Sequence, residues 1–351
     1  MSSTSQVVPP PIPEGESMEE LLVAAPQLVR KRRSQLRIIL DRFLRNRLAV
    51  AGFVVLLLLT LGAIFAPVLT GASAANPDPS ISIDLHNTFA SPSLHHPLGT
   101  DELGRDEFAR ILYGGRVSLL VGITSMFMAL VVGVGIGAFA GYFGGIIDTL
   151  LMRATDVILA IPLYLLLFVL SAGSNGEIIG LVLPEILPWW GIGNHIVSFL
   201  QGALGNSNWV IVNIAILIAI FGWTYTARLV RGEFLALKER EYVLAARTLG
   251  ASNLRLMLRH ILPNAAGPII VNATLLVGAN IITESVLSFF GFGIQVPLAS
   301  WGTMVESARD YIIPNPILVW APGLCILLVV LSFNVMGDGL RDALDPYLTE
   351  R

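Results

Sequence analysis

Two carboxylates interrupt long apolar stretches of the chain, which makes them the first candidates for chemistry. Asp156 lies within the apolar stretch 149–172, and Glu284 lies within 265–290, where Ser288 follows it by one helical turn. A charged side chain at the middle of a bilayer costs about 2.5 to 3.5 kcal/mol on insertion scales, so it needs a partner or water. Such carboxylates can carry a coupling ion, line a polar path, or pair with a neighbouring helix.

The sequence separates these roles only in part. Arg153 precedes Asp156 by three residues, and this spacing favours an ion pair on one helix face. For Glu284 two hypotheses stay open: it faces a watery cavity with Ser288 and contacts a solute, or it pairs with a neighbouring helix. Asp156, Glu284 and Ser288 are therefore the candidates for a polar path through the membrane.

Motifs for catalysis are missing from the chain. There is no Gly-x-x-x-x-Gly-Lys-Ser/Thr phosphate loop, no His-Glu-x-x-His zinc motif and no Gly-x-Ser-x-Gly nucleophile elbow. The five histidines lie in loops, and a solvated pair is favoured over a metal site for His95 and His96. We therefore predict no catalytic residue, no metal site and no cofactor bound by this chain.

The composition is that of a membrane protein. Hydrophobic residues make up 54% of the 351 residues and charged residues only 13%, and the mean hydropathy is +0.72. A soluble domain has about a quarter charged residues. The single cysteine, Cys325, excludes an intramolecular disulfide. The lipid bilayer, and not a nucleic acid, is the expected environment.

Six apolar stretches have the length that a bilayer crossing needs. They are residues 48–69, 117–140, 149–172, 210–229, 265–290 and 317–336. Pro162 is expected to kink the third, because proline has no amide hydrogen for the helix. We therefore predict an all-α membrane protein with six transmembrane helices, which places both termini on the same side.

Lysine and arginine decide which side that is. All but four of the 22 basic residues fall before the first span, in the loops that follow spans two and four, or in the C-terminal tail. The other four are Arg105, Arg110, Arg116 and Arg309. Positive residues are retained in cytoplasmic loops, so both termini are expected in the cytoplasm.

Three regions follow from this division. Residues 1–29 are rich in proline and glutamate and are expected to be a disordered cytoplasmic tail. Residues 30–116 hold a basic segment, the first span and an outer loop that ends in a short surface helix near Phe108 and Leu112. Residues 117–351 form a core of five spans, with a second outer loop at 173–208 expected to be an interfacial cap.

A stripe of small residues in the second span predicts a close helix contact. Ala129, Gly133, Gly137 and Gly141 recur every fourth residue, a pattern that lets another helix approach closely. Packing within this chain is favoured over a seam with a second permease subunit or a part of the translocation path. Gly337 is expected to end the last helix.

A polar segment at 238–263 separates spans four and five. Tyr242, Ala245, Ala246 and Leu249 fall on one helix face, Gly250 can end that helix, and Ser252 can cap the next. The second helix has its apolar residues at Leu254, Met257, Leu258 and Ile261, and Pro263 is expected to stop it. Two short amphipathic helices joined at a glycine predict a docking surface, with a helix lying on the membrane surface as the alternative.

This segment resembles the coupling loop of ABC importer permeases. Ala245–Ala246, Gly250 and Leu262–Pro263 match its Glu-Ala-Ala, Gly and Leu-Pro pattern, while Leu244 stands where the family has Glu. In the family this loop fits a groove on the cytoplasmic ATPase. The residues that the resemblance assigns to ATPase coupling are Tyr242, Leu244, Ala245, Ala246, Gly250, Ser252 and Arg255.

Other stretches resemble the dipeptide, oligopeptide and nickel branch of the same family. They are residues 96–118, 223–241, 287–293 and 337–346. The resemblance implies the type I ABC importer permease fold in a prokaryotic inner membrane, with peptides or related small solutes as cargo. It also implies a second homologous permease subunit, two ATPase subunits that hold ATP and Mg, and an external solute-binding protein.

An ion-gradient-driven secondary transporter is the alternative from another class. Asp156 and Glu284 would then be its coupling carboxylates. Such a carrier needs no docking loop, and six spans without an obvious internal repeat fit it less well.

Overall fold

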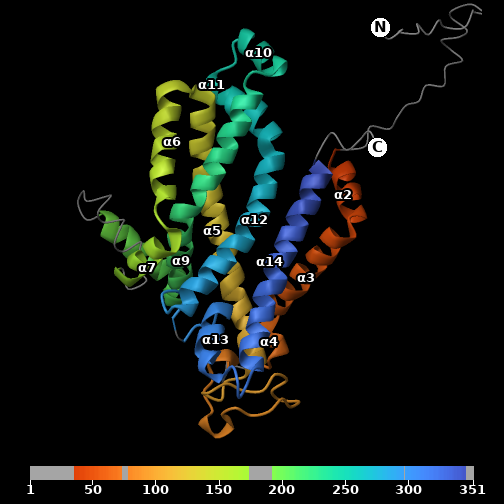
Figure 1. Ribbon diagram of the computed structural model, residues 1–351, viewed down its shortest axis with the longest axis vertical. Helices are drawn as coiled ribbons and strands as arrows, with labels where there is room; N and C mark the ends of the chain where they lie inside the picture. The colour runs from red at the N-terminus through yellow and green to blue at the C-terminus, as the bar shows by residue number, and fades with distance from the viewer. Residues whose placement is uncertain (1–34, 73–77, 174–191, 296, 345–351) are drawn as a thin grey trace, which may run out of the picture.

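The computed structural model describes residues 35–72, 78–173, 192–295 and 297–344. The tail expected at 1–29 and part of the expected cap, 174–191, lie outside the described residues. The chain forms an elongated helical bundle (Figure 1). Helices α10 and α11 lie at one end of the bundle, and α13 and α4 lie near the other.

The described residues are almost entirely helical or in loops, with one isolated β-bridge between Thr100 and Asp106. In the first half of the chain the α-helices are α2 Gln35–Arg45, α3 Arg47–Ile64, α4 Ala66–Leu69, α5 Glu107–Phe143, α6 Gly145–Ala160 and α7 Leu163–Gly173. In the second half they are α9 Ile192–Leu237, α10 Glu241–Thr248, α11 Asn253–Arg255, α12 Leu262–Phe289, α13 Trp301–Ala308 and α14 Ile317–Leu344. The all-α expectation is therefore confirmed for this part of the chain.

Five helical segments in the described residues are long and apolar enough to cross a membrane. They lie in α3, α5, α9, the α11–α12 segment and α14. The expected third span is divided into α6 and α7, which are bent by 80° at the break. Ile161 there has extended backbone (φ −86°, ψ 132°), because a residue before proline is driven out of the helical region. The expected effect of Pro162 is confirmed, and the pair is a sixth candidate span if counted as one.

Helices α5 and α9 pack along the stripe of small residues. Gly133, Gly137 and Gly141 are buried. A Cβ at Gly137 would lie 2.5 Å from the carbonyl oxygen of Ala227, and one at Gly133 would lie 2.7 Å from that of Trp223. These distances are too short for any side chain, so the stripe serves packing within the chain, as favoured above.

Close packing also explains why Gly337 does not end the last helix. Helix α14 runs on to Leu344, which makes the expected stop at Gly337 wrong. A Cβ at Gly337 would lie 2.6 Å from Thr274 Oγ1 of α12, and one at Gly339 would collide with Ala49 of α3. The contacts with α12 and α3 outweigh the low helix propensity of glycine, which is about 1 kcal/mol less favourable than alanine inside a helix.

Two expectations for the outer segments are also wrong. The surface helix near Phe108 is the first turn of α5, which starts at Glu107 because Asp106 caps it and accepts from Phe108 N at 2.9 Å. Residues 192–208, expected in a loop, belong to α9.

The loop before α5 is held by Asp101, whose carboxylate binds both Arg105 and Arg110.

Candidate functional site

Helix α10 protrudes at one end of the bundle (Figure 1) and is attached to it through one side only. Val243 is fully buried, and Ala246 packs against the same cluster, which includes Leu256 and Ile261. Tyr242 is 41% exposed and Leu249 88% exposed. The apolar stripe predicted on this helix therefore points largely away from this chain, and Val243 is the anchor that the sequence pattern did not single out.

Gly250 makes the turn after α10, as expected. Its φ is +83°, in the left-handed region. Gly250 N donates to Arg247 O at 3.0 Å, and Ala251 N donates to Ala246 O at 3.1 Å. These two bonds form the Schellman motif that closes many helices. Ser252 stands at the N-cap position of α11, but its side chain makes no capping hydrogen bond.

The second helix does not stop at Pro263, which corrects that prediction. The chain passes from α11 through a π-helix, Leu256–Ile261, directly into α12. Leu262 N donates to Met257 O, five residues back. A π-type adjustment of this kind accommodates a proline in a continuing helix, because it changes which carbonyls need a donor.

The α10–α11 pair is tied to α5 by a polar contact. Tyr142 donates its hydroxyl to Asn253 Oδ1 at 2.7 Å, and the Arg247 guanidinium lies 6.0 Å from the centre of the Tyr142 ring. Leu254 of α11 and Leu258 of the π-helix that follows it are large apolar residues left exposed, at 62% and 56%. Six of the seven residues assigned to coupling are exposed and Ala246 is half-buried.

Glu284 lies fully buried and pairs with neighbouring elements. Its Oε2 accepts from Ser118 of α5 at 3.1 Å, and its Oε1 accepts from Ser288 at 2.7 Å. Ser118 Oγ accepts in turn from Trp301 N at the start of α13, and Ser288 Oγ accepts from Ile294 N. Of the two hypotheses for Glu284, the structure shows the second, a carboxylate that joins α5, α12 and α13.

Asp156 does not use Arg153, so the expected ion pair is wrong. Arg228 of α9 lies 2.5 Å from Asp156 Oδ1, and both side chains are about half exposed. Arg231, one turn further along α9, contacts both oxygens of Asp148 at 2.5 and 2.6 Å. The long helix α9 brings these arginines against α6, a tertiary contact that local spacing does not reveal.

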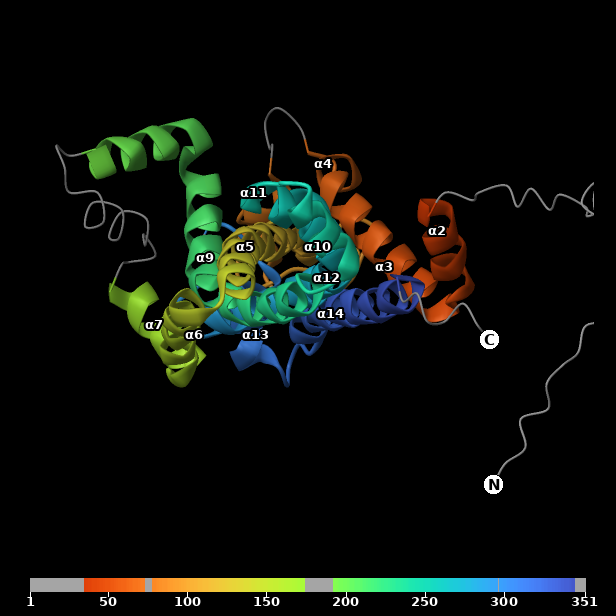
Figure 2. The same ribbon diagram turned by 90° about the horizontal axis from the view of Figure 1, so that it is seen from above.

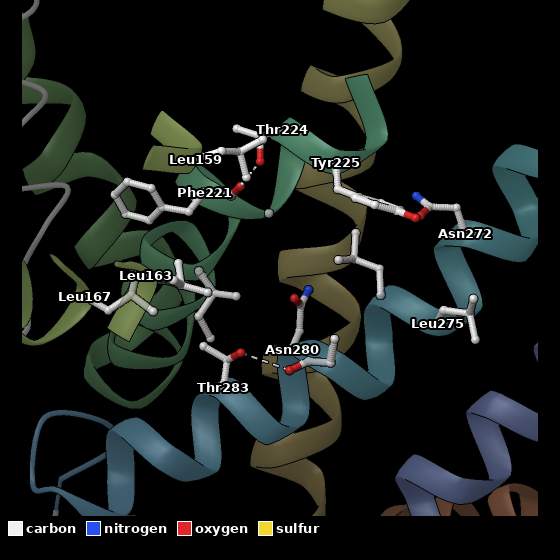
Figure 3. Close-up of a pocket in the computed structure, with 14 residues that line it drawn as sticks. Leu159, Leu163, Leu167, Phe221, Thr224, Tyr225, Asn272, Leu275, Asn280 and Thr283 are labelled. Carbon is white, nitrogen blue, oxygen red and sulfur yellow. Dashed lines mark hydrogen bonds between the residues drawn. The ribbon is translucent and has the colours of Figure 1, made fainter. Parts of the chain in front are cut away.

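A cavity of about 370 Å³ lies between α6, α7, α9 and α12 (Figure 3). Its walls are mainly apolar, but Asn272, Asn280 and Thr283 of α12 and Thr224 and Tyr225 of α9 add polar groups. A second cavity, of about 630 Å³, shares Tyr225, Asn272 and Leu275 with the first. It is also lined by Glu233 and Arg341.

The polar residues of α12 were not among the candidates expected from the sequence. Asn272, Asn280 and Thr283 are spaced by eight and three residues, which places them on one side of a helix. Asn272 donates to Thr226 Oγ1 at 2.9 Å, and Asn280 donates to Ser125 Oγ at 2.8 Å. Uncharged polar residues recurring on one face of an apolar span are the signal that could have found them.

Comparison with known proteins gives the family. Residues 133–350 match the family described as the binding-protein-dependent transport system inner membrane component. Residues 34–92 match the N-terminal TM domain of oligopeptide transport permease C.

Named relatives cover most of the chain. The dipeptide transport system permease protein DppC of Alkalihalophilus pseudofirmus is 41% identical over 303 residues, 86% of each chain. The oligopeptide transport system permease protein OppC of Bacillus subtilis is 38% identical over 88% of each chain. The glutathione transport system permease protein GsiD of Pectobacterium atrosepticum is 38% identical over 88% of this chain and 89% of its own length. With its helical spans and its protruding α10, this chain belongs to the dipeptide and oligopeptide permease family of binding-protein-dependent ABC importers, as a non-catalytic, multi-pass component of the inner membrane.

Proposed function

We propose that this chain forms one half of the pore of an ATP-driven importer for peptides or related small solutes, glutathione included. The names of its relatives support this class of cargo. Its partners in the proposal are a second homologous permease, two ATPase subunits that bind ATP and Mg, and an external solute-binding protein.

The protruding α10 carries the proposal for ATPase coupling. It offers Tyr242, Leu244 and Leu249 on a surface that this chain does not cover. Full burial of an exposed leucine side chain contributes about 1.5 to 3 kcal/mol, and Leu249, at 88% exposed, has the most to gain from docking. The Schellman turn at Gly250 and the Tyr142–Asn253 hydrogen bond would pass the motion of α10 to α5 and α12.

The position of the basic residues supports the orientation. Arg240, Arg247, Arg255 and Arg259 lie in or beside α10 and α11. The described chain also begins with α2 and ends with α14 toward this end (Figure 1). We infer that this end is cytoplasmic and that both termini lie there.

The cavity between α6, α7, α9 and α12 is the proposed translocation surface. The Asp156–Arg228 pair is half exposed and needs water or protein around it in a membrane. The side of α6 and α9 that carries this pair would therefore face the pore and the second permease. Asn280, Thr283 and Tyr225 would offer hydrogen bonds to a passing amide. Glu284 and Ser288, the earlier candidates, would hold the outer end of the path together.

The finer fold assignment belongs to this proposal too. We infer a type I importer permease with six spans, in which α6 and α7 form one broken span. Residues 1–29 would be the cytoplasmic tail, 30–116 the basic segment with the first span and outer loop, and 117–351 the core with the coupling loop 238–263.

A matched pair of substitutions tests the docking surface. Leu249→Asp should abolish retention of the ATPase subunits when the permease complex is purified, because the leucine is 88% exposed on α10. Leu94→Asp, at a fully exposed leucine in the loop at the opposite end, should retain them. Normal ATPase retention by Leu249→Asp would refute the proposed docking.

A further inference from the structure

Helix α2 is an amphipathic helix on the flank of the bundle, beyond α3 and α14 (Figure 2). It packs against α14 and α3, and it is separated from α10, which lies over the middle of the bundle in this view. Its sequence, QLRIILDRFLR, contains three arginines and one aspartate, and Arg47 follows at the start of α3.

The apolar side of α2 has two parts. Ile39 and Phe43 are half-buried, whereas Leu40 is 55% exposed and Leu44 is 57% exposed. Leu40 and Leu44 are one helical turn apart and therefore form a continuous ridge. Leu48, 71% exposed at the start of α3, extends this apolar surface toward the membrane span.

Exposed arginines border that ridge. Arg37 lies one turn before Leu40, Arg45 follows Leu44, and Arg47 lies next to Leu48. All three are exposed, and among the described residues none of them forms an ion pair. A helix with leucines on one side and arginines beside them suits the boundary between acyl chains and headgroups.

The junction with α3 fixes α2 at that boundary. Asn46 separates the two helices and accepts from Ala49 N at 3.2 Å, which caps α3. Ala49 is fully buried and packs closely against Gly339 of α14. Because α3 is a membrane span, its capped first turn sets the depth of α2 in the bilayer.

We propose that Arg37, Arg45 and Arg47 of α2 bind the headgroups of anionic phospholipids, while Leu40 and Leu44 insert among the first acyl carbons. The ridge continues the exposed apolar surface of α3, where Leu57 and Leu58 face outward. Lipid is therefore its occupant, because the contacts proposed above for the ATPases and the second permease use other sides of the bundle. Lipid bound to this surface would fix the position of the N-terminal end of α3. Through the contact of Ala49 with Gly339, it would also fix the end of α14, which lies beside the second cavity.

Lipid quenching in vesicles tests the proposal on the full-length chain. Leu40→Cys in a Cys325→Ser background provides one site for a fluorescent label. The protein is reconstituted with brominated phosphatidylglycerol or with brominated phosphatidylcholine. We expect stronger quenching by phosphatidylglycerol, at least about fivefold in relative association constant, which is what one arginine near an anionic surface contributes. This preference should fall as salt is added, because the charges are exposed.

Charge variants show whether the preference for phosphatidylglycerol depends on these three arginines. Replacing Arg37, Arg45 and Arg47 together by glutamine should remove the preference, and replacing all three by lysine should keep it. Arg309→Gln, an exposed arginine at the opposite end, should leave it unchanged. Equal quenching by both lipids, an unaffected glutamine variant, or a label shielded from both lipids by protein would each overturn the proposal.

Discussion

The turn at Gly250 offers the sharpest test of how motion leaves α10. Its φ is +83°, a backbone conformation that glycine adopts freely and asparagine tolerates. Most other residues adopt it at a cost of about 1 to 2 kcal/mol. No atom lies within 4 Å of where a Cβ would stand, so an added side chain acts through the backbone alone. We expect Gly250→Asn to behave nearly as the parent and Gly250→Ala to lose about 1 kcal/mol at the turn.

Gly250→Pro should break the turn. Proline holds φ near −65° and has no amide hydrogen, so the bond to Arg247 O is lost, and the bond from Ala251 N to Ala246 O loses its geometry. Two hydrogen bonds at about 1 kcal/mol each, added to the conformational strain, give about 3 to 4 kcal/mol. Because 1.4 kcal/mol is a factor of ten, the native turn would become more than about a hundredfold less populated.

The assay compares ATP hydrolysis with solute uptake in vesicles that contain the complete transporter. Uptake per ATP should fall in the order Gly, Asn, Ala and Pro at position 250, while the amount of inserted protein stays constant. Gly71→Pro is the matched control, because Gly71 has φ +67°, an open Cβ position and a similar bond from Ala72 N to Pro67 O at the other end. It should leave uptake per ATP unchanged. Full uptake per ATP by Gly250→Pro would refute the reasoning.

Three further outcomes are expected. Gly137→Ala should lower thermal stability by about 1 to 3 kcal/mol, because its Cβ would lie 2.5 Å from a carbonyl oxygen of α9. Gly135→Ala, where nothing lies within 4 Å, should leave the melting temperature unchanged or raised. Exchanging the charges of Asp156 and Arg228 together should restore the uptake that Asp156→Arg loses, and a double-mutant cycle should give only about 0.2 to 1 kcal/mol, since both side chains are half exposed. A cysteine at Ser252 in a cysteine-free background should react with impermeant reagent only from the cytoplasmic side, and labelling from outside would contradict the orientation.

The sequence allowed the spans and the α10 turn to be predicted because both depend on local signals. Apolar length identifies a crossing helix whatever it packs against. Gly250 predicts its own turn, since few other residues adopt that backbone. Pro162 predicts a break for an equally local reason.

Errors arose where a distant contact outweighs the local preference. Gly337 is read as a helix stop from propensity alone, but its neighbour in α12 requires a residue without a side chain. Asp156 has a suitable arginine three residues away, yet α9 supplies Arg228 from 72 residues further along the chain. Val243 could not be chosen as the anchor of α10, because the sequence does not show from which side the bundle approaches.

The π-helix before Pro263 connects these observations. Between α10 and the cavity, the backbone has one segment with altered hydrogen bonding, Leu256–Ile261, and it lies where Met257 and Ile261 pack against the base of α10. A regular α-helix there would place Pro263 against the carbonyl four residues before it, which costs about 3 kcal/mol. The π turn avoids that clash and keeps α11 and α12 continuous. In the proposed coupling, a push on α10 would pass the Gly250 turn and then reach α12 through one continuous helix, which also carries Asn272, Asn280 and Thr283 into the cavity.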